Sequence, residues 1–450
     1  MARFTGVIVA VAFYFSLFIT VTSSAAFPPK SAKTFSLPVA HNVDAPRHGP
    51  SEYLKTLKKY KLDIPEGLQE TVDAYKATAK ANKAVAGDVG GAVQAASRDG
   101  DLLWLTPVAI GSPPQQLYLD LDSGSSDTWV FSTDTEKEEV SGQTLWDPRK
   151  SKTSQKIKNC TWSIIYGDFS TSEGICYKDT LSFGNFSIPN MTIESATSVS
   201  SMFTESSYMS GLVGLAWSSI IQTIPKQKSL LDYLPLVLSQ PLFTVDLRHN
   251  SSEGSYNFGF INDSLHTTEV EYVNVNNSLG YWGVQQTGFS IGGSDIKYEF
   301  DEAQDVVIDT GSTLLYAPAE AVQMYFNSVP GANYSYREYG WVLPCNSTPP
   351  DFIFELGDTD GNKITGSVPG AYFIYAHSTD ETCYAGLQSL GSFSSMPSIF
   401  GDIFLKSGFA VFDIGNKRFG LGSKPLNTSN QKREVDARGE SIDAYGENGS

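Results

Sequence analysis

Two acidic turns of this 450-residue chain have the residue types for shared acid–base chemistry. The first lies in LDLDSGSSDTWV (119–130), where Asp122 precedes Ser-Gly; the second lies in DVVIDTGSTLLYAP (305–318), where Asp309 precedes Thr-Gly. A solvated acidic loop would explain either turn alone. Two carboxyl groups held close together cannot both ionise easily, so one keeps a proton while the other stays charged. Such a pair can take a proton from water and polarise a carbonyl group.

A second repeat has the same spacing. The segments SGLVGLAW (210–217) and SIFGDIFL (398–405) align at Gly214 and Gly401, which are separated by 187 residues, as the two aspartates are. One offset shared by two independent motifs indicates a duplicated unit. We therefore expect two lobes related by a pseudo-twofold axis, with the two aspartates meeting at the interface.

The neighbours of both aspartates suit this use. The glycine two positions after each aspartate lets the backbone approach closely. We expect the hydroxyl residue directly after each aspartate to hydrogen-bond across to the opposite turn. The serine three positions after it should reach the outer carboxylate oxygen. These supporting residues are Ser123, Gly124, Ser125, Thr310, Gly311 and Ser312.

The body that must position these turns has the pattern of β-structure. From residue 99 onward, short runs rich in Val, Ile, Thr, Tyr and Phe alternate with Gly, Ser, Asn and Asp turns, as in LFTVDLR and FIFELGD. Helical patterns are few, and AEAVQMYFNSV after Pro318 is the best of them. The sequence therefore predicts an all-β body, too long for one sandwich, with an N-terminal lobe at 99–280 and a C-terminal lobe at 281–425.

On these motifs the sequence resembles the pepsin-like aspartic proteases, above all the secreted fungal enzymes, over roughly residues 99–425. The resemblance implies a bilobal fold with a cleft between two β lobes. It also implies that Asp122 and Asp309 activate a water molecule for direct attack on a peptide bond, with neither a metal nor another cofactor. Hydrophobic side chains would be preferred beside the cut bond.

The same resemblance implies a flap hairpin that closes over the substrate. The matching segment is SIIYGDFSTSEG (163–174), in which Tyr166, Gly167 and Asp168 would hold the extended substrate backbone. Trp129 matches the tryptophan that supports the flap tyrosine. Asp168 has two readings that both stay open: it lets Lys occupy the position before the cut bond, or it is a turn residue satisfied by its own backbone.

Three positions depart from the family pattern. Ser123 stands where Thr is commoner, and it keeps the hydroxyl group. Phe169 replaces a usual Gly at the flap tip, and Ser210 stands where an Asp commonly precedes the apolar-apolar-Gly motif. We expect these changes to affect specificity more than activity.

The N-terminus has the parts of a secretory signal peptide, residues 1–26. Arg3 precedes an apolar run, and small residues close this run near Ala25 or Ala26. A membrane anchor is the alternative. Secretion also suits the abundant N-x-S/T sites of an exposed glycoprotein. These sites include Asn185, Asn190, Asn250, Asn262, Asn333, Asn346 and Asn427.

Four cysteines in a secreted chain predict two disulfides. Cys160 and Cys176 are symmetric about residue 168, the expected hairpin tip, so they would lie opposite each other on neighbouring strands. Cys345 and Cys383 match the usual C-lobe disulfide of the resembled family.

Residues 27–98 differ in charge from the rest of the chain. They hold eleven Lys/Arg against seven Asp/Glu, a balance of +4, whereas residues 99–450 hold twenty against forty-two, a balance of −22. A separate small domain is one explanation; in a secreted protein we favour a removable pro-segment held by opposite charge. Residues 426–450 form a polar tail.

In the resembled family a pro-segment lysine often neutralises the catalytic pair. The string KKYKLDIP (58–65) occupies the corresponding place, so we assign this role to Lys59, with Lys61 as the second choice. At acidic pH the carboxylates become protonated, the attraction weakens and the segment would be released.

The acidic composition, with a net charge of −17, argues against nucleic acid as a partner. The expected partners are polypeptide substrates and pepstatin-type inhibitors. We expect a monomer that is free of the membrane in its mature form and extracellular, with a vacuole as the alternative destination. The rival function is a catalytically silent binding protein on the same fold, but such relatives usually lose an aspartate or the turn glycine.

Overall fold

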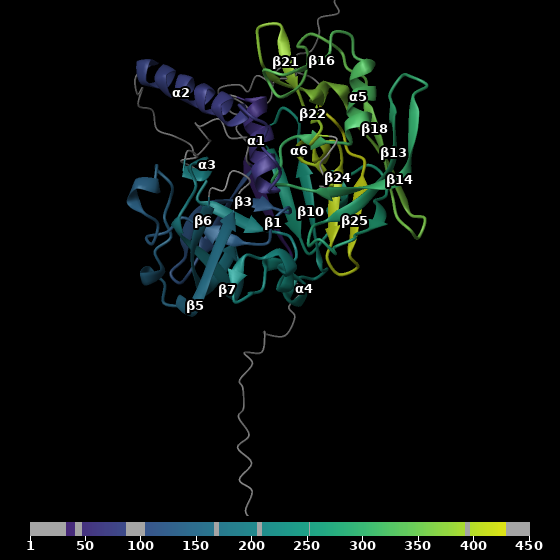
Figure 1. Ribbon diagram of the computed structural model, residues 1–450. Helices are drawn as coiled ribbons and strands as arrows, with labels where there is room; N and C mark the ends of the chain where they lie inside the picture. The colour runs from purple at the N-terminus through teal and green to yellow at the C-terminus, as the bar shows by residue number, and fades with distance from the viewer. Residues whose placement is uncertain are drawn as a thin grey trace, which may run out of the picture.

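The computed structural model describes residues 33–40, 47–86, 104–165, 171–204, 209–251, 253–391 and 397–428, to which every structural statement refers. Figure 1 shows two β-rich halves, the first in blue and teal and the second in green and yellow, with helix α1 (Gly49–Lys59) between them. The predicted all-β, two-lobed architecture is confirmed.

The largest sheet has 14 strands in the order β12-β25-β24-β10-β11-β1-β2-β3-β8-β4-β7-β6-β5-β9. Strands from both ends of the chain lie in this sheet: the N-terminal β1 pairs with β11, and the C-terminal β24 pairs with β10. The sequence did not predict this sharing of one sheet. Its strands are β1 (Phe35–Ala40), β2 (Leu105–Ile110), β3 (Gln115–Asp122), β4 (Thr128–Val130), β5 (Gln155–Ile165), β6 (Thr171–Phe183), β7 (Phe186–Ser198), β8 (Gly211–Gly214), β9 (Thr223–Ile224), β10 (Leu242–Leu247), β11 (Glu253–Phe258), β12 (Glu271–Asn274), β24 (Phe409–Asp413) and β25 (Arg418–Gly422).

The second half adds a seven-stranded sheet, β19-β18-β13-β14-β23-β15-β22, and a four-stranded sheet, β16-β17-β21-β20. The strands of the seven-stranded sheet are β13 (Gly283–Ile291), β14 (Lys297–Ile308), β15 (Leu315–Tyr316), β18 (Phe352–Gly357), β19 (Lys363–Val368), β22 (Leu387–Gln388) and β23 (Ser398–Phe400). Those of the smaller sheet are β16 (Asn333–Ser335), β17 (Gly340–Pro344), β20 (Ile374–His377) and β21 (Thr382–Ala385).

Helices are short apart from two in the N-terminal segment. The helix expected after Pro318 is present as α5 (Ala319–Asn327), with Ala321, Val322, Tyr325 and Phe326 buried on its apolar face. None of the described helices is long and apolar enough to cross a membrane. The other helices are α2 (Leu68–Ala86), α3 (Ser201–Thr204), α4 (Leu234–Val237) and α6 (Asp402–Leu405).

The strand pairing has the duplicated organisation expected from the repeat. β3 runs parallel to β8 with Asp122 opposite Gly214, and β14 runs parallel to β23 with Ile308 opposite Phe400, one residue before Asp309 and Gly401. A Cβ atom on either glycine would overlap backbone atoms of the aspartate turn in front of it. Each Gly therefore lets one strand pass directly behind one turn.

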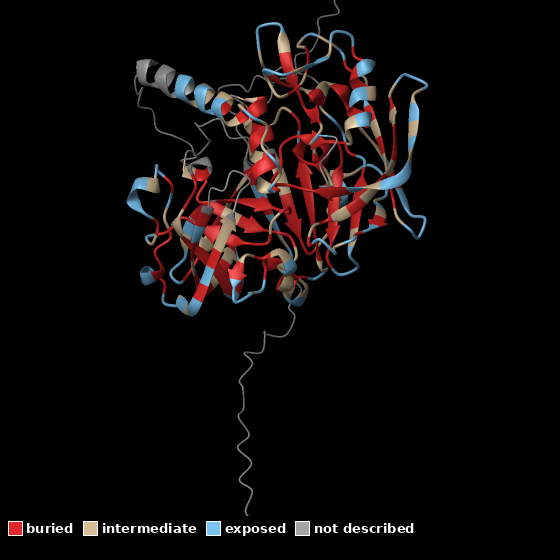
Figure 2. Ribbon diagram, viewed as in Figure 1, coloured by how far each residue is buried: buried red, intermediate tan, exposed pale blue. Residues whose placement is uncertain are grey.

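The N-terminal segment is packed into this body. β1 pairs with β11 over six residue pairs and touches β2 at Ala40–Leu105. In α1, Pro50 lies in the first turn, where a missing N–H costs nothing, and Leu54 and Leu57 are buried in the main core. Figure 2 shows α1 largely in red, the colour of buried residues. The boundary of the segment at residue 98 stays a prediction, because residues 87–103 lie outside the described parts.

Both disulfides have the predicted pairing. Cys160 on β5 bonds Cys176 on β6, with their Cα atoms 5.4 Å apart, and Cys345 bonds Cys383. The first disulfide joins neighbouring strands of one hairpin, so it restrains the base of that hairpin.

A buried carboxyl pair lies behind the first aspartate turn. Glu194 on β7 is fully buried, and its polar neighbours are the Asp127 carboxyl group and the Thr128 N–H. Burial and the nearby Asp127 carboxylate raise the pKa of Glu194 well above its usual value. Burial likewise raises the pKa of Asp127 to about 6, although the Gln222 N–H opposes this shift.

Because of these raised pKa values, we expect the folded protein to be less stable at neutral pH than in acid. A carboxyl group whose folded pKa lies above its unfolded pKa stabilises the fold in acid, and this contribution is lost as pH rises through the folded pKa. For Asp127 that loss falls between about pH 4 and 6.

We therefore predict that Glu194→Gln stabilises the protein at pH 7.5 and changes little at pH 5. The amide keeps the shape of the side chain without its charge, so the gain should be about 1–3 kcal/mol at the higher pH. Thermal unfolding of intact precursor, checked by electrophoresis, measures it at both pH values. Glu271→Gln, at the exposed first position of β12, is the matched control. An equal shift at both pH values, or no shift, would contradict the prediction.

Candidate active site

Asp122 ends strand β3, and its turn gives it two hydrogen bonds. The Gly124 N–H donates to its Oδ1 at 2.8 Å, and the Ser125 hydroxyl donates to its Oδ2 at 2.7 Å. Leu117, Leu119 and Leu121 alternate into the core, so Asp122 projects from the opposite face of the strand. The aspartate is buried.

Asp309 follows strand β14 and has the same arrangement. The Gly311 N–H donates to Oδ1 at 2.9 Å, and the Ser312 hydroxyl donates to Oδ2 at 2.5 Å. A Cβ atom on Gly311 would collide with the Asp122 carboxylate, and one on Gly124 would collide with the Asp309 carboxylate. Each turn therefore approaches the opposite aspartate so closely that only glycine fits.

Reciprocal hydrogen bonds link the two turns. The Thr310 N–H donates to Ser123 Oγ at 2.9 Å, and the Ser123 N–H donates to Thr310 Oγ1 at 2.9 Å. Each hydroxyl in turn donates to a backbone carbonyl of the opposite strand, Ser123 to Ile308 and Thr310 to Leu121. Four buried bonds thus fix the separation of two segments 187 residues apart.

Lysine 59, at the end of α1, bridges both aspartates. Its Nζ lies 2.7 Å from Asp122 Oδ1 and 2.9 Å from both carboxylate oxygens of Asp309. The Tyr60 hydroxyl donates to Asp309 Oδ2 at 2.8 Å. The pair is therefore covered from the cleft side by two side chains of the N-terminal segment.

The two aspartates differ in proton affinity. Burial and the Asp309 charge raise the pKa of Asp122, against the opposing effect of Lys59. Burial also disfavours the charge on Asp309, but Lys59, the Ser312 hydroxyl and the Gly311 N–H together lower its pKa to about 2. In this state Asp309 is the ionised member and Asp122 is the member more easily protonated.

Residues of the C-terminal lobe hold helix α1 in place. The Thr313 hydroxyl donates to Glu52 Oε2 at 2.8 Å, and the Tyr316 hydroxyl donates to Thr56 Oγ1 at 3.1 Å. Gly49 packs on the ring of Tyr384 so closely that any side chain there would overlap it. The helix therefore occupies a surface lined by tyrosine and hydroxyl groups.

The flap residues Tyr166, Gly167 and Asp168 lie outside the described residues, as does Phe169. The strands that carry them, β5 and β6, form the expected hairpin. Trp129 is fully buried, and its Nε1 donates to no group of the described residues. The assignment of the flap therefore stays a prediction.

Several site residues were missed from the sequence alone. Tyr60 was given no role in the site, although it stands next to Lys59. Asp120 is buried in the site, where burial raises its pKa to about 7 against the charge of Lys55. Its place two residues before Asp122, on the same strand face, was the available signal. Thr313 and Tyr316 gave no local signal.

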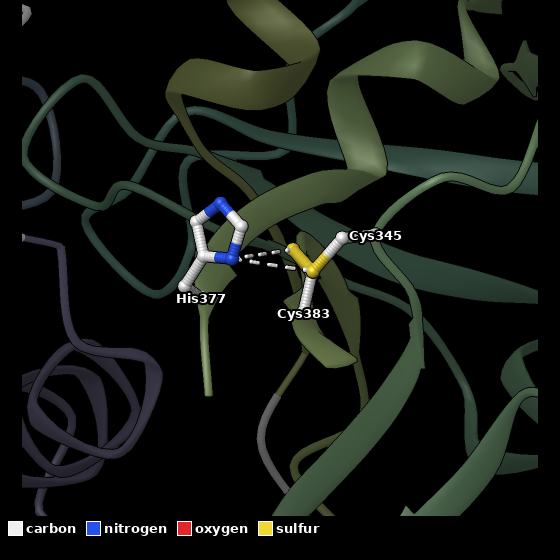
Figure 3. Close-up of side chains that lie close together, drawn as sticks. All are labelled: Cys345, His377 and Cys383. Carbon is white, nitrogen blue, oxygen red and sulfur yellow. Dashed lines mark hydrogen bonds between the residues drawn. A yellow bond between two sulfur atoms is a disulfide. The ribbon is translucent and has the colours of Figure 1, made fainter. Parts of the chain in front are cut away.

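One other cluster of potential ligands lies in the C-terminal lobe. Figure 3 shows His377 beside the Cys345–Cys383 disulfide, with Nδ1 3.4 Å from Cys345 Sγ. Both sulfur atoms are in the disulfide, so neither offers the thiolate that a metal ion would need. The cluster therefore carries no argument for a metal site.

Comparison with known proteins agrees with this geometry. Residues 103–424 match the sequence model of the family described as eukaryotic aspartyl protease. The chain is 37% identical to endothiapepsin of Cryphonectria parasitica over 391 residues, which cover 86% of this chain and 90% of that protein. It is 38% identical to podosporapepsin of Podospora anserina, with 83% and 86% covered. It is also 38% identical to aspergillopepsin-1 of Aspergillus oryzae, with 79% and 88% covered.

The paired aspartate turns and the match over most of the chain lead to one conclusion: this protein belongs to the eukaryotic aspartyl protease family and is an aspartic-type endopeptidase, a hydrolase of internal peptide bonds.

Proposed function

We propose that this chain is the precursor of a secreted, acid-active endopeptidase whose catalytic residues are Asp122 and Asp309. The observation that carries the proposal is the pair itself: two buried carboxyl groups with unequal proton affinity, bridged by one ammonium group. Secretion rests on the signal-like N-terminus, and a vacuolar destination is the alternative. The enzyme would act on polypeptides and be inhibited by pepstatin-type compounds.

In the proposed mechanism the site holds a water molecule where Lys59 Nζ now lies. The ionised aspartate accepts a proton from this water as it attacks the carbonyl carbon of the peptide bond. The protonated aspartate donates a hydrogen bond to the carbonyl oxygen, on which negative charge develops. The resulting tetrahedral intermediate collapses when the leaving nitrogen takes a proton from the pair, so no covalent enzyme intermediate is needed.

We further propose that residues 27–98 form an inhibitory pro-segment. Lys59 and Tyr60 fill the position of water and substrate, so peptide hydrolysis is blocked while α1 is bound. Against the effect of burial, Lys59 acts with the Ser312 hydroxyl and the Gly311 N–H to lower the pKa of Asp309 to about 2. A lowered folded pKa means that the contact contributes above the ordinary value near 4 and is lost as pH falls toward 2. Acid would therefore release the segment.

For specificity we propose a preference for hydrophobic side chains beside the cut bond. Tolerance of Lys before the cut would come from Asp168. We also propose that the mature enzyme is a monomer that works free of the membrane.

The first test is peptide hydrolysis across about pH 2.5–7 by the acid-activated protein, with and without pepstatin. We predict cleavage in acid that pepstatin abolishes.

Replacing Asp309 by Asn removes the ionised member of the pair, and kcat should fall by at least about 10²–10⁴-fold with KM little changed. Asp360→Asn, in an exposed turn, is the control for an acidic residue outside the site. Retained activity in Asp309→Asn would overturn the assignment, and inactive, folded wild type would favour the binding-protein rival.

A second test concerns the precursor. We predict that Lys59→Met lets the precursor process itself at a pH at least about one unit higher than wild type, because the ammonium no longer favours the ionised form of Asp309. N-terminal sequencing over a pH series gives the midpoint of processing. Lys61→Met is the matched control, because Lys61 is exposed two residues away. Equal midpoints for wild type and Lys59→Met would contradict the inhibitory role.

A further inference from the structure

A non-helical stretch, Leu62–Pro65, leads the chain away from the aspartate pair. At one end Lys59 and Tyr60 contact the aspartates. Leu62 and Ile64 then pack, partly buried, against the main core. At the other end, before α2 begins, the chain reaches the hairpin β16–β17 of the C-terminal lobe. Chain residues thus occupy a continuous path from the centre of the site to this hairpin.

The contact at the hairpin is made through the backbone of the seated chain. The Tyr339 hydroxyl, between β16 and β17, donates to the carbonyl oxygen of Glu66 at 2.8 Å. A Cβ atom on the next residue, Gly67, would collide with this hydroxyl. A backbone carbonyl is present in every residue of every polypeptide, so the same hydrogen bond is available to any chain that follows this path.

The backbone of Tyr339 is itself unusual. Its φ is 53°, in the left-handed region that a bulky residue seldom adopts and where glycine would be less strained. A tyrosine at such a position points to a use for its side chain. Its ring packs, partly buried, against the main core, and its hydroxyl is directed to the carbonyl oxygen of Glu66.

More tyrosine surrounds this contact. Tyr334 is 44% exposed and Tyr336 is 86% exposed, and their rings pack edge to face with centroids 5.2 Å apart. Tyr334 also meets the ring of Trp341 on β17. Exposed tyrosines offer rigid contact area with a polar tip at low entropic cost, which suits them to binding peptide chains. Adjacent exposed aromatic rings commonly mark an interaction surface.

We propose that the hairpin β16–β17 extends the substrate-binding cleft. After the N-terminal segment leaves, Tyr339 donates its hydrogen bond to a backbone carbonyl of the polypeptide substrate, and Tyr334 and Tyr336 pack against side chains of the same substrate. The occupant is polypeptide because a polypeptide already sits there, bound through its backbone. This inference rests on the proposed function of Asp122 and Asp309.

The path length sets the size of substrate that can make this contact. Glu66 is six residues beyond Tyr60, which contacts Asp309. Six residues span at most about 20 Å when extended. A peptide that reaches about three residues on either side of the cut should miss Tyr339, whereas one that reaches about eight residues on the correct side should contact it.

The test compares three peptides with one cleavage core: a short one, one extended on the N-terminal side and one extended on the C-terminal side. Wild type and Tyr339→Phe, both acid-activated, are assayed for kcat/KM. We expect Tyr339→Phe to lose about three- to tenfold on one extended peptide, mainly through KM, and nothing on the short one. Tyr298→Phe is the matched control, because it removes a hydroxyl that bonds Glu320 at the surface of the same lobe.

A second variant guards against a folding explanation. Tyr339→Gly relieves the left-handed backbone, which offsets the loss of the ring's packing against the core, and it should lose the advantage of the extended peptide while keeping wild-type activity on the short one. Activity on the short peptide reports whether this variant is folded. Equal ratios of long to short peptide in wild type and both variants would overturn the inference while leaving the proposed function intact. A wild type that cuts none of the three peptides would overturn the proposed function, and this inference with it.

Discussion

Two carboxyl groups buried side by side destabilise a fold unless a shared proton, a cation or hydrogen bonds compensate their charge. The elements around Asp122 and Asp309 provide this compensation. Each aspartate lies at the end of a central strand. The strand that contains Gly214 or leads to Gly401 passes behind its turn, and a glycine of the opposite turn faces its carboxylate. The cross-linked Ser123 and Thr310 hold the turns at fixed separation. The hydrogen bonds in and between the turns are donated equally by backbone N–H groups and by Ser or Thr hydroxyls, so main chain and side chains fix the geometry together.

In the N-terminal segment, the ammonium group of Lys59 and the hydroxyl group of Tyr60 pair with the two carboxyl groups, where a substrate would present a peptide bond. Lys59 supplies a full positive charge, which helps the Ser312 hydroxyl and the Gly311 N–H to lower the pKa of Asp309 against the effect of burial. Around it, Tyr316 donates a hydrogen bond to Thr56 of helix α1, and Thr313 donates one to the Glu52 carboxylate. The contact therefore combines the ion pair of Lys59 with hydroxyl hydrogen bonds and apolar packing. Under the proposed control of activity, titration of the pair weakens the segment without removing the packing of Leu54 and Leu57.

Much of this could be predicted from the sequence because duplication leaves a signal that needs no structure. The offset of 187 residues predicted the two aspartate turns and the strands that contain Gly214 and Gly401. The cysteine spacing predicted the Cys160–Cys176 disulfide, and the family resemblance predicted Cys345–Cys383. Other features depend on side-chain direction and burial, which no local pattern records. The hydrogen bond from Tyr339 to Glu66 joins residues 273 positions apart, and the pair Asp127–Glu194 looks like two ordinary polar residues until both are found buried. The flap tip, the signal peptide and all but the first three residues of the C-terminal tail lie outside the described residues, so their assignments stay predictions.

The place of β1 has a consequence for how this protein can be made. β1 lies inside a continuous sheet, between β11 and β2, with Leu37 and Val39 buried. A chain synthesised without residues 27–98 would have to assemble the same sheet with no strand at that position. If residues 27–98 are removed after folding, the remaining strands keep the arrangement that they reached with β1 present. Once unfolded, this shorter chain could not refold by the same route, because β1 would be missing. Its persistence would then depend on a high barrier to unfolding rather than on the equilibrium between folded and unfolded states. Heat or alkali that carries it over this barrier once would inactivate it for good.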